Sequence, residues 1–161
     1  MTLWKLIYLE NYTTLLTKFL ELFNPLPGNH YLHVTKELNS ISDTLSKLLL
    51  SVQGELNVEI LSDNDLENAK PFRALPRDND MVIFQDIYSK HKNQSNILKI
   101  AYRTLANTAE LIIIEKKSVL DIDSLKKSLE EHEFRTPNHL DILEGHDIII
   151  AKKMHMWGNG L

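Results

Sequence analysis

Three unbroken runs of apolar residues, rich in isoleucine, constrain the fold of this chain most strongly. They occupy residues 81–84, 111–114 and 148–151. A strand with one face in water alternates apolar and polar side chains, so an unbroken run predicts a strand buried on both faces, as in a parallel sheet covered by helices. The segments between these runs carry apolar residues at helical spacing. The sequence therefore predicts a single doubly wound α/β domain with a mostly parallel sheet.

The expected elements alternate along the chain, with the strands marked by β-branched runs and the helices by caps and apolar spacing. Asn39 or Ser40 caps a helix that Gly54 ends, and Asp121 or Asp123 caps a later one. Residues 64–76 are expected to be irregular, with a short edge strand near 72–75. The expected strands span residues 30–34, 56–61, 81–84, 111–114 and 148–151, with Ile142 and Leu143 in a further strand and a helix over 95–106.

The amino-terminal segment is predicted to be an added helix. Apolar residues recur at helical spacing over residues 1–23, and prolines and a glycine interrupt the chain directly afterwards. The predicted organisation is an N-terminal helix and linker (1–29), an α/β domain (30–153) and a C-terminal tail (154–161). A complete sheet of this kind is not expected to need the added helix to close its core.

The composition excludes several chemistries. The chain has no cysteine, which excludes a disulfide framework, a thiolate metal site and a cysteine nucleophile. It has only 5 glycines, and none of them form the glycine-rich loop that cradles a phosphate. The formal net charge is -4, without a basic stripe, so no nucleic-acid partner is expected.

Neither a membrane nor a metal ion is expected. Charged residues interrupt the apolar amino terminus before any run reaches the roughly 18 residues of a membrane span, and no cleavage site follows, so the predicted location is cytoplasmic. His132, His139 and His146 are seven residues apart. Helical zinc ligands use spacings of about three to five residues, so no metal site is predicted.

The segments 80–87, 97–105 and 109–115 together resemble the second half of class I S-adenosylmethionine-dependent methyltransferases. An aspartate, Asp80, opens a strand, a helix ends in the Arg-x-Leu motif at Arg103, and the next strand ends in an acidic residue, Glu115. The resemblance implies a Rossmann-like fold whose last strand, residues 148–151, runs antiparallel to its neighbour. It also implies S-adenosylmethionine as cofactor.

The cofactor loop departs from the family pattern. In the family this loop carries an acid followed by three glycines at alternate positions. This sequence places His33 at the acid and Thr35, Glu37 and Asn39 at the glycines. Glycines there let the backbone approach the cofactor closely, and three side chains would crowd it. Two further cofactor-binding positions are implied by the resemblance: Asp63, at the ribose-binding acid, and Gln85, after the third strand.

Asp86 and His91 are the candidate catalytic residues. Each is titratable and follows the strand at 81–84, where ligands bind in open α/β sheets. The alternative is that neither residue is catalytic: Asp86 then caps a turn, and His91 is a surface loop residue.

Two functions are compatible with these residues. One is a methyltransferase-like protein that has lost S-adenosylmethionine binding, has no cofactor and acts through protein contacts. The other is an active methyltransferase with an atypical cofactor loop. The missing glycines favour the first.

A homodimer or another protein partner is also expected. The helix over 1–23 has apolar residues beyond one stripe, and a second copy would cover them. The tail, which contains Met154 and Trp157, is a second candidate contact. Alternatively, the amino-terminal helix lies over the cofactor cleft and fills it.

Overall fold

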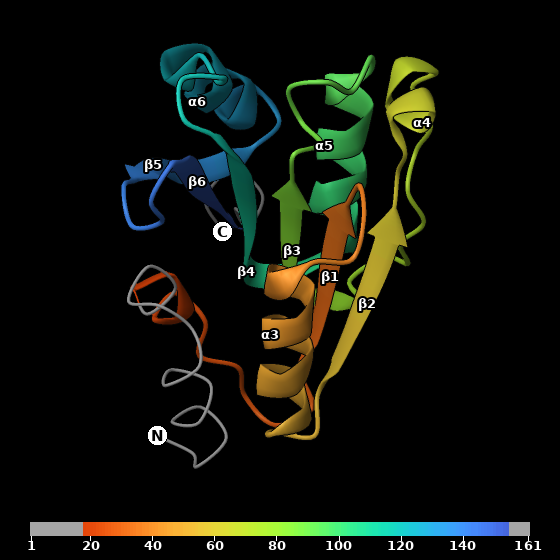
Figure 1. Ribbon diagram of the computed structural model, residues 1–161, viewed down its shortest axis with the longest axis vertical. Coiled ribbons are helices and arrows are strands. Elements are labelled where there is room, and N and C mark those ends of the chain that lie inside the picture. The colour runs from red at the N-terminus through yellow and green to blue at the C-terminus, as the bar shows by residue number, and fades with distance from the viewer. Residues whose placement is uncertain (1–17, 155–161) are drawn as a thin grey trace, which may run out of the picture.

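The computed structural model describes residues 18–154, which form a six-stranded mixed sheet with helices on both faces (Figure 1). This is the α/β architecture that the sequence predicts, and the sheet is mostly parallel. The elements are β1 (His30–Thr35), α3 (Ser40–Leu50), β2 (Glu55–Ile60), α4 (Asp63–Glu67), β3 (Asn79–Gln85), α5 (Gln94–Thr104), β4 (Leu105–Lys116), α6 (Ile122–Glu131), β5 (Phe134–Leu140) and β6 (His146–Lys153).

The strand order across the sheet is β2-β1-β3-β4-β6-β5. The first four strands in this order are parallel, so their carboxyl ends meet at one edge. The last strand, β6, runs antiparallel to β4 with Ile112 opposite Ile150, which confirms the antiparallel direction expected from the resemblance. The remaining strand, β5, pairs antiparallel with β6 at the far side of the sheet.

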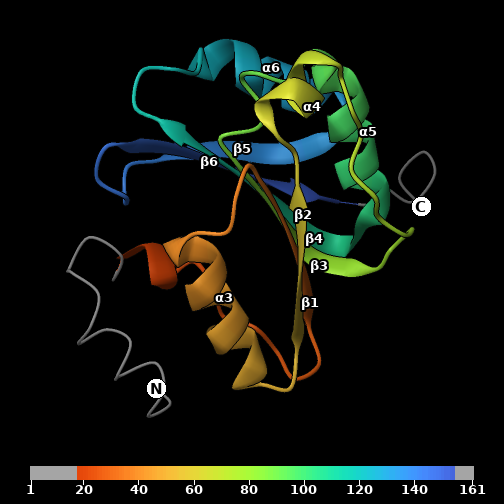
Figure 2. The same cartoon turned by 45° about the vertical axis from the view of Figure 1, so that its right-hand side comes forward.

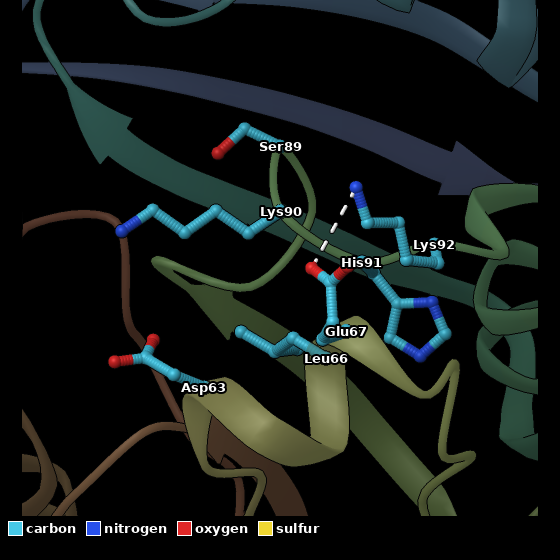
Figure 3. A pocket seen from close by; sticks show the side chains of 7 residues that line it. All are labelled: Asp63, Leu66, Glu67, Ser89, Lys90, His91 and Lys92. Carbon is cyan, nitrogen blue, oxygen red and sulfur yellow. Dashed lines mark ion pairs between the residues drawn. The ribbon is translucent and has the colours of Figure 1, made fainter.

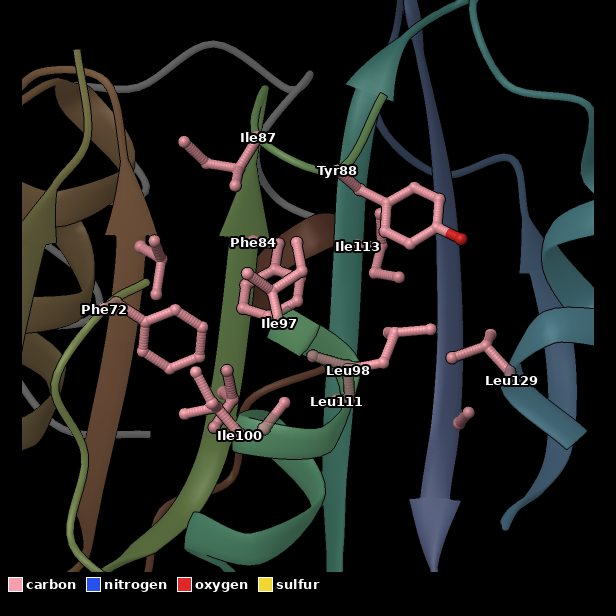
Figure 4. Close-up of a cluster of buried hydrophobic side chains, with 14 of the residues drawn as sticks. Phe72, Phe84, Ile87, Tyr88, Ile97, Leu98, Ile100, Leu111, Ile113 and Leu129 are labelled. Carbon is pink, nitrogen blue, oxygen red and sulfur yellow. The ribbon is translucent and has the colours of Figure 1, made fainter. Parts of the chain in front are cut away.

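Two apolar clusters cover the two faces of the sheet. Figure 2 shows α3 on one side of the sheet and α5 on the other. The cluster on the α5 side includes Phe84 and Ile97 and is drawn in Figure 4. The cluster on the α3 side includes Leu45 and Ile83. Within β3, residues 81–84 alternate between the two clusters and are all buried, which explains why this run contains no polar residue.

The amino-terminal segment belongs to the core on the α3 side. Residues 18–20 are helical, so the helix ends three residues before its predicted end at residue 23. The rest of the predicted helix, residues 1–17, lies outside the described residues. Phe19 and Phe23 are each 1% exposed, and their rings meet edge to face with centroids 5.0 Å apart. The sheet therefore uses this segment to close its α3-side core, contrary to the expectation that it was dispensable.

Polar side chains fix the helix starts. Asn39 caps α3 and accepts hydrogen bonds from the N–H groups of Ile41 and Ser42, and Asp121 caps α6. Such caps stabilise a helix by about 1 kcal/mol each because they satisfy amino-terminal N–H groups that lack partners within the helix. At its other end α3 stops at Leu50, earlier than predicted.

Gly54 is required in the turn between α3 and β2. A Cβ atom at this position would lie 2.5 Å from the carbonyl oxygen of Asn29. This is far inside van der Waals contact, and the neighbour is backbone that cannot move cheaply. Gly54 therefore permits the close approach that starts β2 beside β1, rather than ending the helix itself.

Two expected segments differ in the structure. Residues 64–76 were expected to be irregular, but Ser62 caps the one-turn helix α4 through a capping box with Asp65; no strand forms at 72–75. Ile142 and Leu143 lie in a loop, and β5 instead spans Phe134–Leu140 despite Pro137. Proline is tolerated there because β5 is an edge strand with a register shift.

Replacing Phe19 by alanine should lower the free energy of unfolding by about 3–5 kcal/mol, because a fully buried aromatic ring leaves a cavity. Urea denaturation measures this change. Leu26, which is 65% exposed, provides the control: its alanine variant should change the value by less than about 0.5 kcal/mol. Equal small effects for both variants would contradict a core role for the amino-terminal segment.

Candidate functional site at the carboxyl edge of the sheet

The carboxyl ends of β1, β2, β3 and β4 bring most of the predicted site residues to one edge of the sheet. In open α/β sheets, this edge is where ligands bind. Thr35 ends β1, the loop after it holds Glu37 and Asn39, and Asp63 opens α4 just after β2. Gln85 ends β3, and Asp86 follows it.

The loop after β1 is closed by its own side chains. The Asn39 side-chain amide donates to the Thr35 hydroxyl at 3.3 Å and to the Glu37 carbonyl at 2.9 Å. The Asn39 carboxamide oxygen accepts the Ile41 N–H at 2.9 Å, and the Asn39 N–H donates to the Ser42 hydroxyl at 2.7 Å. Two of the N–H groups that a helix start offers to an anion, those of Ile41 and Ser42, are thus already bonded to Asn39.

The glycine positions of this loop do not require glycine conformations here. No residue from 35 to 39 has a positive φ. The backbone takes a path open to any residue, and the Thr35 and Asn39 side chains form hydrogen bonds within the loop. Their presence therefore costs no backbone strain.

A lysine of the same loop pairs with Asp63, the residue that the resemblance places at the ribose-binding position. Lys36 Nζ lies 2.8 Å from Asp63 Oδ1. This hydrogen bond raises the pKa of Lys36 and lowers the pKa of Asp63. The pair joins the loops after β1 and β2. Sequence reasoning did not predict a role for Lys36, because only the strand order brings these loops together.

His33 is a buried neutral side chain at the end of β1. Its Nε2–H donates to Gln85 Oε1 at 2.8 Å, and its Nδ1 is buried without a hydrogen-bond partner among the described residues. Burial lowers the pKa of His33 to about 4 despite the opposing hydrogen bond to Gln85. Where the family pattern has a carboxylate, this chain therefore has an uncharged ring.

Asp86 marks a turn at the end of β3. Its φ is 57°, in the left-handed region that aspartate tolerates better than most residues, and its N–H donates to the Ile114 carbonyl. Beside it, Glu115 is 3% exposed and accepts the N–H and the hydroxyl of Ser89, each at 2.9 Å. Burial raises the pKa of Glu115. The pattern of the sequence did not single out Ser89, which ties the loop after β3 to β4.

His91 is buried rather than a surface loop residue, contrary to the non-catalytic interpretation of the sequence. Its Nδ1 accepts the Asn93 N–H at 2.9 Å, and its Nε2–H donates to the Lys70 carbonyl at 2.8 Å. Both ring nitrogens are therefore engaged by backbone groups. The ring joins the segment after α4 to the loop after β3, and in this geometry neither nitrogen is free to accept a substrate proton.

A cavity of about 360 Å³ lies between α4 and the loop after β3 (Figure 3). Asp63 borders it on one side and Lys90 on the other. Lys92 and Glu67 form an ion pair across it at 3.7 Å. The lining is mostly charged, which distinguishes this cavity from the apolar pockets that hold most organic ligands. Its lining residues are Asp63, Leu66, Glu67, Ser89, Lys90, His91 and Lys92.

The three histidines that lie seven residues apart in the sequence have separate partners in the structure. His139 bonds to Asp147 at 2.8 Å, whereas His132 and His146 contact the Ser128 and Glu144 carbonyls. Within residues 18–154, no three histidine, aspartate or glutamate side chains are grouped as metal ligands. In the same part of the chain, no helix has the length and apolar character needed to cross a membrane.

The topology agrees with comparisons against solved structures. A SAM-dependent methyltransferase from Aquifex aeolicus superposes with a TM-score of 0.69 and 14% identity, over 96% of this chain and all of that one. The fold is that of the class I methyltransferases.

Further structures share this methyltransferase fold. Phosphoethanolamine N-methyltransferase 2 of Haemonchus contortus, in complex with S-adenosylmethionine, matches with a TM-score of 0.64 and 10% identity, over 88% of this chain and 52% of the enzyme. The CMeT domain of the citrinin polyketide synthase matches with a TM-score of 0.63 and 13% identity, over 80% of this chain and 47% of that one. No protein-family model and no curated protein sequence matches the chain.

The buried His33 should make stability depend on pH. The unfolded chain protonates this residue near its ordinary pKa of 6.5, while the native protein resists protonation until about pH 4. The free energy of unfolding should therefore fall as pH drops from 6.5 toward 4, with this residue contributing about 2 kcal/mol of the loss by pH 5.

Urea denaturation at pH 7.5 and pH 5 measures this effect against the variant His33→Gln, which cannot titrate. The difference between the two pH values should be about 2 kcal/mol smaller in the variant. Glu115 acts with the opposite sign, since its pKa is raised, but it is present in both proteins and cancels in the comparison. An unchanged pH dependence would contradict the buried neutral state of His33.

Proposed function

We propose that this protein is a methyltransferase-like protein that does not bind S-adenosylmethionine and acts through contacts with other proteins. The observation that carries the proposal is the ion pair between Lys36 and Asp63, at 2.8 Å. In the family that this fold resembles, the position of Asp63 binds the cofactor ribose. Here that carboxylate is bonded to a lysine from the loop that would hold the cofactor.

The remaining groups of the loop support the same proposal. An exposed ion pair contributes at most about 1 kcal/mol, so by itself it would not exclude a ligand. At the start of α3, however, the N–H groups of Ile41 and Ser42 are bonded to the Asn39 side chain, and the Asn39 N–H is bonded to the Ser42 hydroxyl. Glu37 adds an exposed carboxylate next to the place where the cofactor's own carboxylate would lie. These residues do not fit the cofactor.

Large exposed apolar side chains at the same edge favour protein contacts. Leu38, in the loop after β1, is 68% exposed, and Ile60, at the end of β2, is 45% exposed. The charged cavity beside them offers little apolar surface to a small organic ligand. A protein surface would cover both side chains without entering a cavity.

The alternative is an active methyltransferase with an atypical cofactor loop. One observation favours it: Asp63 borders the cavity of about 360 Å³ that also reaches the loop after β3. Asp86, the candidate base, lies at the end of that strand. Under this alternative, Lys36 would have to release Asp63 when the cofactor binds.

Thermal unfolding with S-adenosylmethionine and with S-adenosylhomocysteine separates the two functions. We expect no change in melting temperature with either compound at 100 µM. A ligand with a dissociation constant of about 1 µM would stabilise the protein by about 2.7 kcal/mol at this concentration, which is roughly 5–10 °C for a domain of this size. A shift of that size would overturn the proposal.

The double variant Lys36→Ala, Glu37→Gly provides the matched comparison, because it frees Asp63 and removes the added carboxylate. Binding by this variant alone, measured by calorimetry, would show that loop side chains block the cofactor. Binding by the unaltered chain with equal affinity would show that they do not.

A further inference from the structure

One edge of the sheet is formed by β2, and its outer backbone groups have no partners among the described residues (Figure 1). The Glu55 N–H donates to Asn29 and the Leu61 N–H donates to Thr35, both toward β1. In a parallel pair, alternate residues face the partner strand. The residues whose N–H and C=O groups face outward are therefore Leu56, Val58 and Ile60.

The two edges of the sheet differ in how they are protected. The opposite edge strand, β5, contains Pro137, a left-handed residue at Thr136 (φ 48°) and a register shift, all of which hinder pairing with another strand. By contrast, β2 pairs with β1 in continuous register and has no proline, lysine or bulge. The segment after α4 lies beside β2, where residues 72–75 and 57–59 line a common pocket. Its one hydrogen bond to β2 among the described residues runs from the Arg73 N–H to the Glu59 side chain, so it leaves the outward backbone groups of β2 unpaired.

We propose that β2 is the interface of a homodimer, in which it pairs antiparallel with β2 of a second copy about a two-fold axis at Val58. In this register Val58 lies opposite its own copy and Leu56 lies opposite Ile60. Each of these pairs exchanges two backbone hydrogen bonds. All three outward-facing residues of each copy are then paired, and the two sheets become one.

The charges on β2 favour this register over the two registers next to it. Glu55, Asn57 and Glu59 share the α5-side face of the strand. With the axis at Val58, each Glu59 lies opposite an Asn57. Shifting the axis to residue 57 places Glu55 opposite Glu59, and shifting it to residue 59 places Glu59 opposite itself. Like charges directly opposite each other destabilise a strand pair, so both shifts are disfavoured.

The apolar face of β2 is complementary in the same register. Leu56 and Ile60 are cross-strand neighbours there, and the 45% exposure of Ile60 in the single chain would decrease. A second copy satisfies the backbone, the charges and the apolar face together, which is why we assign this edge to a second copy rather than to another strand.

This interface goes beyond the proposed function and does not depend on it, because β2 pairing would persist whether or not S-adenosylmethionine binds. It also differs from a dimer built on residues 1–23 or the tail. Those residues, apart from 18–23 and Met154, lie outside the described part of the chain.

Two substitutions at Asn57, an exposed residue, test the register with opposite expected results. Asn57→Glu places a carboxylate opposite Glu59 of the second copy, and Asn57→Lys places an amine there. Because the pair occurs twice in the dimer, the dissociation constant should rise about 2- to 30-fold for the first and fall by a similar factor for the second. Analytical ultracentrifugation of the full chain measures both.

A cysteine scan tests the geometry directly, because the chain has no cysteine of its own. In the proposed pairing the two Val58 Cα atoms lie about 5.5 Å apart, within disulfide range. Val58→Cys should therefore form a covalent dimer on mild oxidation. Ile60→Cys is the matched control, since its two copies would be about 14 Å apart and should not cross-link.

Several outcomes would overturn the proposal. These are a chain that stays monomeric at several hundred micromolar, a dimer whose dissociation constant is the same for both Asn57 variants, or equal cross-linking at positions 58 and 60. Thermal shift with S-adenosylmethionine, run on the same samples, keeps this result separate from the test of the proposed function.

Discussion

Burial of the central strands on both faces is the constraint on which the rest of this structure depends. Val82, Ile83 and Phe84 of β3 are each fully buried, and they alternate between the two sides of the sheet. Each face therefore needs its own layer of side chains. On the α5 side α5 and α6 supply it, and on the α3 side α3 shares the task with Phe19 and Phe23.

The same constraint separates the strands into two kinds. The central strands cannot change without opening the core, whereas β2 is half exposed and carries glutamates on one face. The outer side of an edge strand has no partner strand to match, and the two edge strands β5 and β2 differ in how regular they are. One is distorted by a proline and a register shift, and the other is regular enough to accept another strand.

The carboxyl edge shows how the loop after β1 can be stable without the glycines of the methyltransferase family pattern. Asn39 satisfies backbone groups in its own loop and at the start of α3, while Lys36 reaches across to Asp63. These bonds tie the loop to α3 and to the start of α4. The methyltransferase fold persists around it because the fold is held by the sheet and its two apolar layers, not by the contacts of this loop.

Much of the fold could be predicted from local patterns. The run at residues 111–114 indicated the centre of β4, and Asn39 and Asp121 indicated two helix starts, because caps and buried runs are properties of neighbouring residues. The errors arose where local signals were short or ambiguous. The single turn of α4 depends on one capping box, and β5 contains Pro137, which an edge strand accepts and a central strand does not.

For the candidate site, the sequence predicts which residues lie at the sheet edge but not which of them bond to one another. The sequence by itself determined that Thr35, Asp63 and Gln85 follow strands, and parallel strands bring their ends together. Only the tertiary structure decided the partners: His33 with Gln85, 52 residues away, and His91 with the Lys70 carbonyl, 21 residues away. Such pairs depend on strand order and register, which are set by the packing of the whole core rather than by any neighbouring residue.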